Sequence, residues 1–119
     1  MGHFKVMIRD RYVDVVQPDL MYNGGLIRAL RVARMAAMAG INATPHSPKH
    51  NPELATLLHY AAVARNTGPF LEFPAVKVRY DSWYAPQFVI REGGYIQVPT
   101  GPGLGISYDE GIWAKAQAI

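Results

Sequence analysis

Three short apolar segments, each stopped by a proline and separated by helix-like stretches, constrain the fold of this chain most strongly. Residues 13–16 contain three valines and are followed by Pro18, which cannot donate to a sheet ladder, so we expect a buried strand that ends there. Asn23-Gly24-Gly25 is typical of a turn, and a helix should follow to about Ala39 before a terminating glycine. The predicted apolar side of this helix consists of Leu26, Ile27, Leu30, Ala33, Met35 and Ala37.

A second strand and helix follow the same pattern, in which a proline ends the strand and a helix comes after it. Residues 41–44 form a short apolar segment ended by Pro45, and Asn51-Pro52-Glu53 is typical of a helix start with Asn as the N-cap. That helix is expected to reach about Arg65, and residues 70–73 would form a third strand before Pro74. Its predicted apolar positions are Leu54, Leu57, Leu58, Ala61 and Ala62. The order strand, helix, strand, helix, strand predicts an α/β fold with a parallel sheet and right-handed crossovers.

The residues after Pro74 have a different character. Residues 87–91 and 95–98 flank Glu92-Gly93-Gly94, which predicts an antiparallel hairpin. Residues 99–106 are glycine-rich and irregular, and a short helix is expected from Asp109. We therefore divide the chain into an α/β part, residues 1–74, and a hairpin with a tail, residues 75–119.

Length and composition limit what this pattern can build. The 119 residues are fewer than the roughly 250 of a complete eight-stranded α/β barrel. The absence of cysteine excludes disulfides, thiolate metal sites and cysteine nucleophiles. No apolar run approaches the roughly 20 residues of a membrane span, so a cytoplasmic protein without a membrane partner is expected. The net charge is +3, but Arg28, Arg31 and Arg34 follow one helix face, which predicts a solvated face and no nucleic-acid partner.

Asp19, His46 and Glu72 lie at or near the end of each predicted strand. The carboxyl ends of parallel strands meet at one edge of a sheet, where barrel enzymes place catalytic groups. An Asp that accepts a hydrogen bond from one ring nitrogen of a His fixes its tautomer and leaves the other nitrogen free to move a proton. Singly, Asp19 could be a turn residue, His46 a packed strand-end residue and Glu72 a solvated carboxylate. Their matching positions favour a catalytic set.

Four motifs in order, VVQPDLMYNGGLIRALRVARMA, TPHSP, GPFLEF and VPTGPGLGI, resemble the C-terminal region of the mandelate racemase and muconate-lactonizing group of the enolase superfamily. The resemblance implies that residues 1–74 are the last three β/α units of a TIM-type barrel, strands six to eight, and that residues 75–119 join a capping domain. It implies that Asp19 and His46 form a proton-transfer dyad. Glu72 then corresponds to the residue that hydrogen-bonds the substrate carboxylate, and both Glu72 and Tyr22 are expected to bind the substrate.

The same resemblance implies what the chain does not contain. Family members bind Mg²⁺ through carboxylates on earlier strands, so the metal ligands are expected upstream and none in this chain. We accordingly expect a lyase (dehydratase) or isomerase (racemase) acting on a sugar acid or 2-hydroxy acid, with the isolated chain inactive. The missing N-terminal half or another subunit would be its partner, and a homo-oligomer is expected. The alternative is a non-catalytic fragment or association module.

Overall fold

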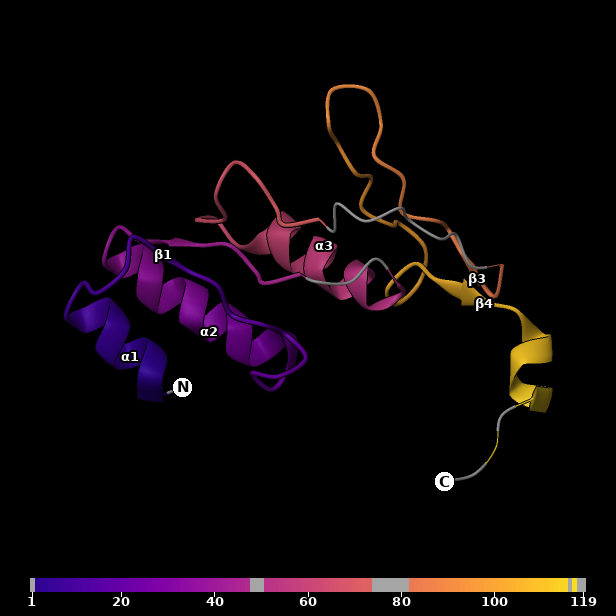
Figure 1. The fold of residues 1–119 in the computed structure, drawn as a ribbon, viewed down its shortest axis with the longest axis horizontal. Helices are drawn as coiled ribbons and strands as arrows, with labels where there is room; N and C mark the ends of the chain where they lie inside the picture. Colours follow the sequence, from indigo (N-terminus) through magenta and orange to yellow (C-terminus); the bar gives the residue numbers. More distant parts are fainter. Residues whose placement is uncertain (1, 48–50, 74–81, 116, 118–119) are drawn as a thin grey trace.

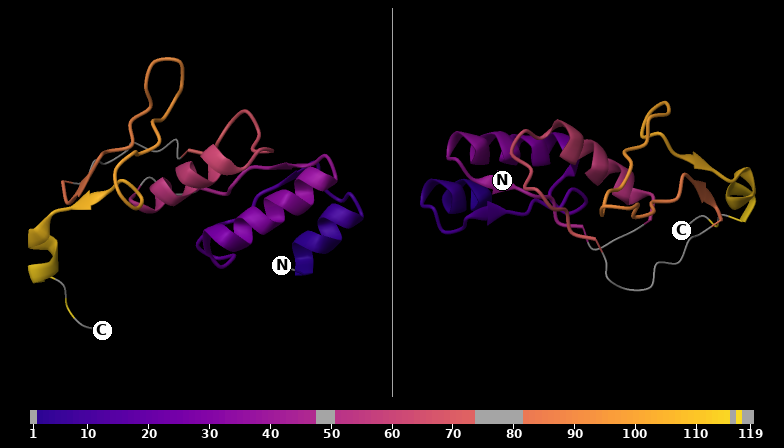
Figure 2. Two further views of the ribbon diagram at one scale, coloured as in Figure 1. Left: turned by 180° about the vertical axis from the view of Figure 1, so that it is seen from behind. Right: turned by 90° about the horizontal axis from the view of Figure 1, so that it is seen from above.

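The computed structural model describes residues 2–47, 51–73, 82–115 and 117, and it is elongated. α1 (Gly2–Arg9) lies beside α2 (Gly25–Met38) at one end, α3 (Glu53–Val63) lies in the middle, and the C-terminal part forms the other end (Figures 1 and 2). The radius of gyration is 16.0 Å, whereas a compact domain of this length would have about 13.5 Å. The molecule is therefore more open than a closed globular domain.

A two-stranded parallel sheet joins the first two predicted strands. β1 (Val15–Val16) pairs with β2 (Asn42–Ala43), with Val15 opposite Asn42 and Val16 opposite Ala43. α2 forms the crossover between them, as the sequence predicted. Val16 and Ala43 are both buried because the inner face of this sheet packs into the core. Beyond the prolines, Asp19 and His46 form an isolated parallel bridge that continues the same register.

α2 ends close to Gly40, as the sequence predicted. Gly40 has φ 68°, and the amides of Ala39, Gly40 and Ile41 return to carbonyls of the last helical turn. The buried side of α2 is rotated from the predicted one, because Ile27 and Ala37 are exposed. Its buried residues are Ala29, Val32, Ala33 and Ala36. Small side chains on this face let α2 lie close to the sheet and to α3.

α3 begins and packs largely as predicted. The side-chain oxygen of Asn51 accepts a hydrogen bond from the Glu53 amide at 3.1 Å, which satisfies one free donor of the first turn. Leu54, Leu57 and Leu58 are buried and Ala61 is half-buried, but Ala62 is exposed. The structure adds Tyr60, which is buried and donates its hydroxyl hydrogen to the Ala43 carbonyl at 2.9 Å.

The predicted third strand, residues 70–73, does not form. A strand is defined by its backbone pairing, and within the described residues this segment pairs with no other. Phe70 is 82% exposed, whereas Phe73 is half-buried against the core. The parallel sheet of the described residues therefore has two strands instead of three, and Glu72 reaches its position from an extended segment.

The C-terminal part contains a different sheet from the predicted one. Of the expected hairpin, the turn forms: Arg91 and Tyr95 make an antiparallel bridge around Gly93 and Gly94, which both have φ 80°. Its arms are not strands, because backbone pairing stops at that bridge. Instead β3 (Tyr84–Ala85) pairs antiparallel with β4 (Ser107–Tyr108). The expected short helix is the 3-10 helix η1 (Glu110–Lys115).

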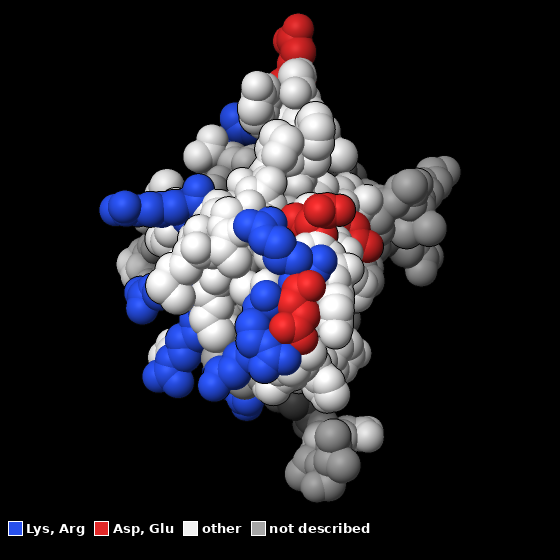
Figure 3. Space-filling model, turned by 90° about the vertical axis from the view of Figure 1, so that its left-hand side faces the viewer, with Lys and Arg blue, Asp and Glu red and all other residues white. Residues whose placement is uncertain are grey.

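Basic side chains extend from several points of the surface. Arg28, Arg31 and Arg34 are all exposed on α2, in line with the predicted solvated face. Figure 3 shows Lys and Arg spread over one side of the molecule with Asp and Glu among them. Arg9, for example, pairs with Asp10 at 2.6 Å. Among the residues that the structure describes, no helix has the length and apolar character needed to cross a bilayer.

Candidate active site

Asp19 and His46 meet at the carboxyl ends of β1 and β2. Because the two residues form a parallel bridge, their side chains leave neighbouring positions of the sheet edge. Asp19 Oδ2 lies 3.0 Å from His46 Nδ1. An ionised carboxylate can only accept, so the hydrogen of neutral His46 lies on Nδ1 and the lone pair on Nε2. The His46 side chain is 42% exposed, so part of the ring faces solvent.

The other oxygen of Asp19 fixes its side chain. Oδ1 accepts hydrogen bonds from the amides of Met21 and Tyr22, at 2.8 and 2.9 Å. Burial on its own would raise the pKa of Asp19, but the hydrogen bonds from His46 and from these two amides outweigh it, so the pKa lies below its ordinary value. Asp19 is therefore both oriented and kept ionised next to the imidazole.

Glu72 approaches the other ring nitrogen. Its Oε2 lies 3.8 Å from His46 Nε2, too far for a hydrogen bond but within the range of a charge interaction. The same oxygen accepts a hydrogen bond from the Ser47 amide at 2.8 Å. His46 thus lies between two carboxylates, one bonded to Nδ1 and one near Nε2. The three residues predicted from their strand ends are brought together.

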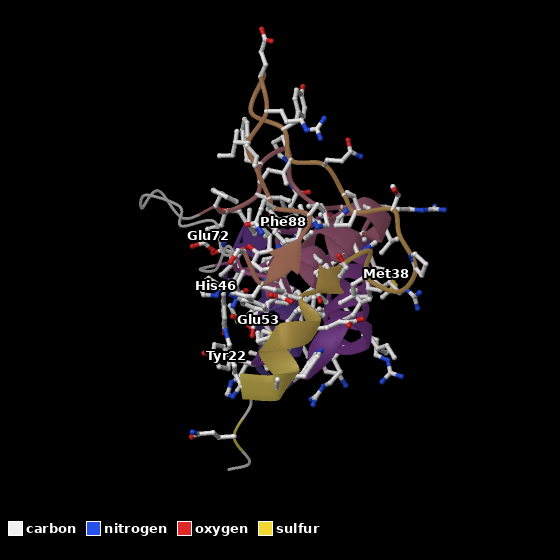
Figure 4. The ribbon with its side chains drawn as sticks, turned by 90° about the vertical axis from the view of Figure 1, so that its right-hand side faces the viewer. Tyr22, Met38, His46, Glu53, Glu72 and Phe88 are labelled. Atoms are coloured by element: carbon white, nitrogen blue, oxygen red, sulfur yellow. The ribbon has the colours of Figure 1, made fainter. Side chains whose placement is uncertain are left out.

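Tyr22 lies one turn after Asp19 and points into solvent. Its side chain is 82% exposed, and its main-chain amide is the group that contacts Asp19. Figure 4 shows Tyr22, His46 and Glu72 along one side of the molecule. The structure therefore places Tyr22 on the side of the dyad without bringing its ring into a hydrogen bond with it among the described residues.

The described residues do not form a metal centre. No group of three or more His, Cys, Asp or Glu in the described part of the chain could hold a metal ion. Both carboxylates beside His46 already accept hydrogen bonds from main-chain amides, whereas Mg²⁺ requires several oxygen ligands in near-octahedral geometry. The location of the metal ligands upstream stays a prediction.

Sequence reasoning missed Ser47 as part of this site. Ser47 directly follows His46 in the motif TPHSP, and nothing in its residue type indicates a role. The structure shows that it is 2% exposed and that its amide holds Glu72. The signal available in the sequence was its position next to a strand-end histidine.

The comparisons with known proteins agree with the motifs. D-galactonate dehydratase of Ralstonia pickettii is 31% identical over 92% of the chain, and arabinonate dehydratase of Saccharolobus solfataricus is 29% identical over 94%. The chain spans 30% of the length of each of these relatives. A racemase candidate from Roseobacter denitrificans has a structure with a TM-score of 0.86 and 30% identity, over 98% of this chain and 33% of that one.

These relatives are sugar-acid dehydratases, and the structural match places the same fold within a larger protein. The sequence profile of the family described as enolase C-terminal domain-like matches residues 1–112, nearly the whole chain. The resemblance to the mandelate racemase and muconate-lactonizing group is thereby confirmed, and the chain belongs to the enolase C-terminal domain-like family.

Proposed function

We propose that this chain supplies the proton-transfer side of an enolase-superfamily enzyme that removes the proton α to the carboxylate of a sugar acid. The observation that carries the proposal is the contact between Asp19 Oδ2 and His46 Nδ1 at 3.0 Å, on a His46 side chain that is 42% exposed. The dehydratase relatives support a sugar acid as the substrate class. The chain spans less than a third of their length, so the activity belongs to a larger protein.

His46 Nε2 is the proposed base. When it takes the α-proton, the imidazolium lies between the Asp19 and Glu72 carboxylates, which stabilise its charge. The Nε2–H can then donate to a departing β-hydroxyl, giving water and a dehydrated product. Racemisation instead needs a proton donor on the opposite face of the α-carbon, because return of the proton from Nε2–H to the same face restores the starting configuration. We favour dehydration because both curated relatives named above are dehydratases.

Glu72 and Tyr22 are the proposed substrate-binding residues. Glu72 is 40% exposed next to Nε2, so its free oxygen can contact a substrate held there. Tyr22 projects from the same side of the molecule. Mg²⁺ is implied for the complete enzyme by the family resemblance, with its ligands on strands upstream of this chain. The described residues account for proton movement and for part of substrate binding.

Exchange of the substrate α-proton in D₂O tests this proposal. With D-galactonate and arabinonate as substrates, the complete enzyme containing this chain should exchange the α-proton, and His46→Asn should abolish that exchange while substrate still binds. His59→Asn, the same change on α3, is the matched control and should exchange at the parent rate. If His46→Asn exchanges as fast as the parent, the base lies elsewhere. The isolated 119-residue chain should not exchange.

An association module is the second candidate. The exposed aromatic side chains of Phe70 and Tyr95 and the open shape favour a chain that is covered by another polypeptide. Under this alternative, His46→Asn would leave every activity of the complete protein unchanged, so the exchange experiment separates the two.

A further inference from the structure

The peptide between His46 and Ser47 links two residues of the candidate site. Its carbonyl belongs to His46, and its N–H donates to Glu72 Oε2 at 2.8 Å. Ser47 is 2% exposed, so this peptide lies in a fixed, packed environment. A shift of the strand end that moved His46 would therefore also move the donor that holds Glu72.

Among the described residues, Glu72 accepts a hydrogen bond only from the Ser47 amide. It comes from residues 70–73, which pair with no strand in the described part of the chain. Its side chain is 40% exposed, and it reaches His46 Nε2 only at 3.8 Å. The Ser47 amide is thus the short contact that determines where this carboxylate lies relative to the ring.

We propose that Ser47 is a positioning residue whose main-chain N–H holds Glu72 beside His46 Nε2; this rests on the proposed function of His46 as the base. The arrangement mirrors the other side of the ring, where the amides of Met21 and Tyr22 hold Asp19. Each carboxylate that flanks the imidazole is fixed by main-chain donors of a strand end. The imidazolium formed during proton transfer then meets two charges that need no rearrangement.

The serine hydroxyl is separable from this role. Ser47 Oγ is buried and has no hydrogen-bond partner among the described residues. Ser47→Ala keeps the N–H and removes only the hydroxyl, so it should leave Glu72 in place. Exchanging the His46–Ser47 amide for an ester, by incorporating the α-hydroxy analogue of serine, removes the N–H and keeps the side chain.

NMR of the 119-residue chain tests the contact directly. An amide proton bonded to a carboxylate lies downfield of one bonded to a neutral amide oxygen, so Glu72→Gln should move the Ser47 amide proton upfield. The amide protons of Met21 and Tyr22, which bond Asp19, should keep their positions. Glu92→Gln, at the exposed turn, is the control and should move none of them. A Ser47 amide proton that keeps its position in Glu72→Gln overturns the proposal.

Kinetics of the complete enzyme test its consequence. Losing a hydrogen bond to a charged group should lower kcat for the amide-to-ester variant roughly 10-fold to 100-fold, with a smaller change in KM, while Ser47→Ala stays near the parent. An ester variant with parent kcat overturns the positioning role. A complete enzyme that exchanges no α-proton overturns the proposed function. The NMR measurement needs no substrate, so it tests the contact between Ser47 and Glu72 separately from that function.

Discussion

Tyr60 should make the stability of this chain depend on alkaline pH. Its buried hydroxyl donates to the Ala43 carbonyl of β2, and burial raises its pKa from about 10 to about 12. The folded state therefore favours the neutral phenol. The contribution of the neutral Tyr60 phenol to the free energy of unfolding is fully present below pH 10, the unfolded pKa. It is lost as pH rises through the folded pKa. Two pKa units correspond to roughly 3 kcal/mol, of which about half is lost by pH 11.

Urea unfolding between pH 8 and pH 11.5, followed by circular dichroism, measures this loss. Tyr60→Phe should cost about 1–3 kcal/mol at pH 8, because the buried Ala43 carbonyl loses its donor, but it should remove the extra alkaline loss. The difference between parent and variant should therefore shrink as pH rises. Tyr22→Phe, at an exposed tyrosine, should follow the parent curve. Parallel curves for parent and Tyr60→Phe from pH 8 to 11.5 would refute the reasoning.

Three further predictions concern stability at acid pH, the hydrogen bonds of the Asn66 side chain and self-association of the open molecule. Because the pKa of Asp19 is lowered, its contribution to the free energy of unfolding is present above pH 3.8 and is lost as pH falls through the folded pKa. Asp19→Asn should therefore reduce the fall in melting temperature at acid pH. An unchanged fall would contradict a lowered pKa for Asp19. Asn66 donates to the Ala33 and Ile41 carbonyls at 3.1 and 2.8 Å, so Asn66→Ala should cost about 1–3 kcal/mol in urea unfolding, whereas an effect under 0.5 kcal/mol would show that the clamp is dispensable. The chain should self-associate in light scattering at about 100 µM, and a monomer there would count against an incomplete barrel.

The sequence predicted the first two strands and two helices because their signals are local. Pro18 and Pro45 end the strands, and Gly40 adopts the left-handed conformation that ends α2. The rotation of the buried side of α2 was not predictable in the same way. Which of several apolar faces is buried depends on what packs against it, and Ile27 is apolar but 70% exposed.

The elements that sequence reasoning missed depend on contacts between distant residues. α1 has eight residues and no acidic residue in its first turn, and its one fully buried side chain, Ile8, joins the core cluster that contains α2. β3 and β4 are two residues each, and their pairing is accompanied by stacking of Trp83 on Tyr108 at 6.0 Å. α1 is only eight residues long, and a long-range pairing of two-residue strands leaves no periodic pattern to read.

Glu72 shows how a site can be predicted through a wrong element. The expectation rested on a third strand whose end would bring Glu72 to the same sheet edge as Asp19 and His46, and that strand does not form in the described residues. The Glu72 side chain nevertheless lies beside His46, because the Ser47 amide donates to its carboxylate, 3.8 Å from the imidazole. Chain order and the shared direction of the strands bring residue 72 near the edge, and a main-chain donor then fixes it. The position of Glu72 should accordingly be more sensitive to the peptide at Ser47 than to substitutions in residues 70–73 that leave the carboxylate intact.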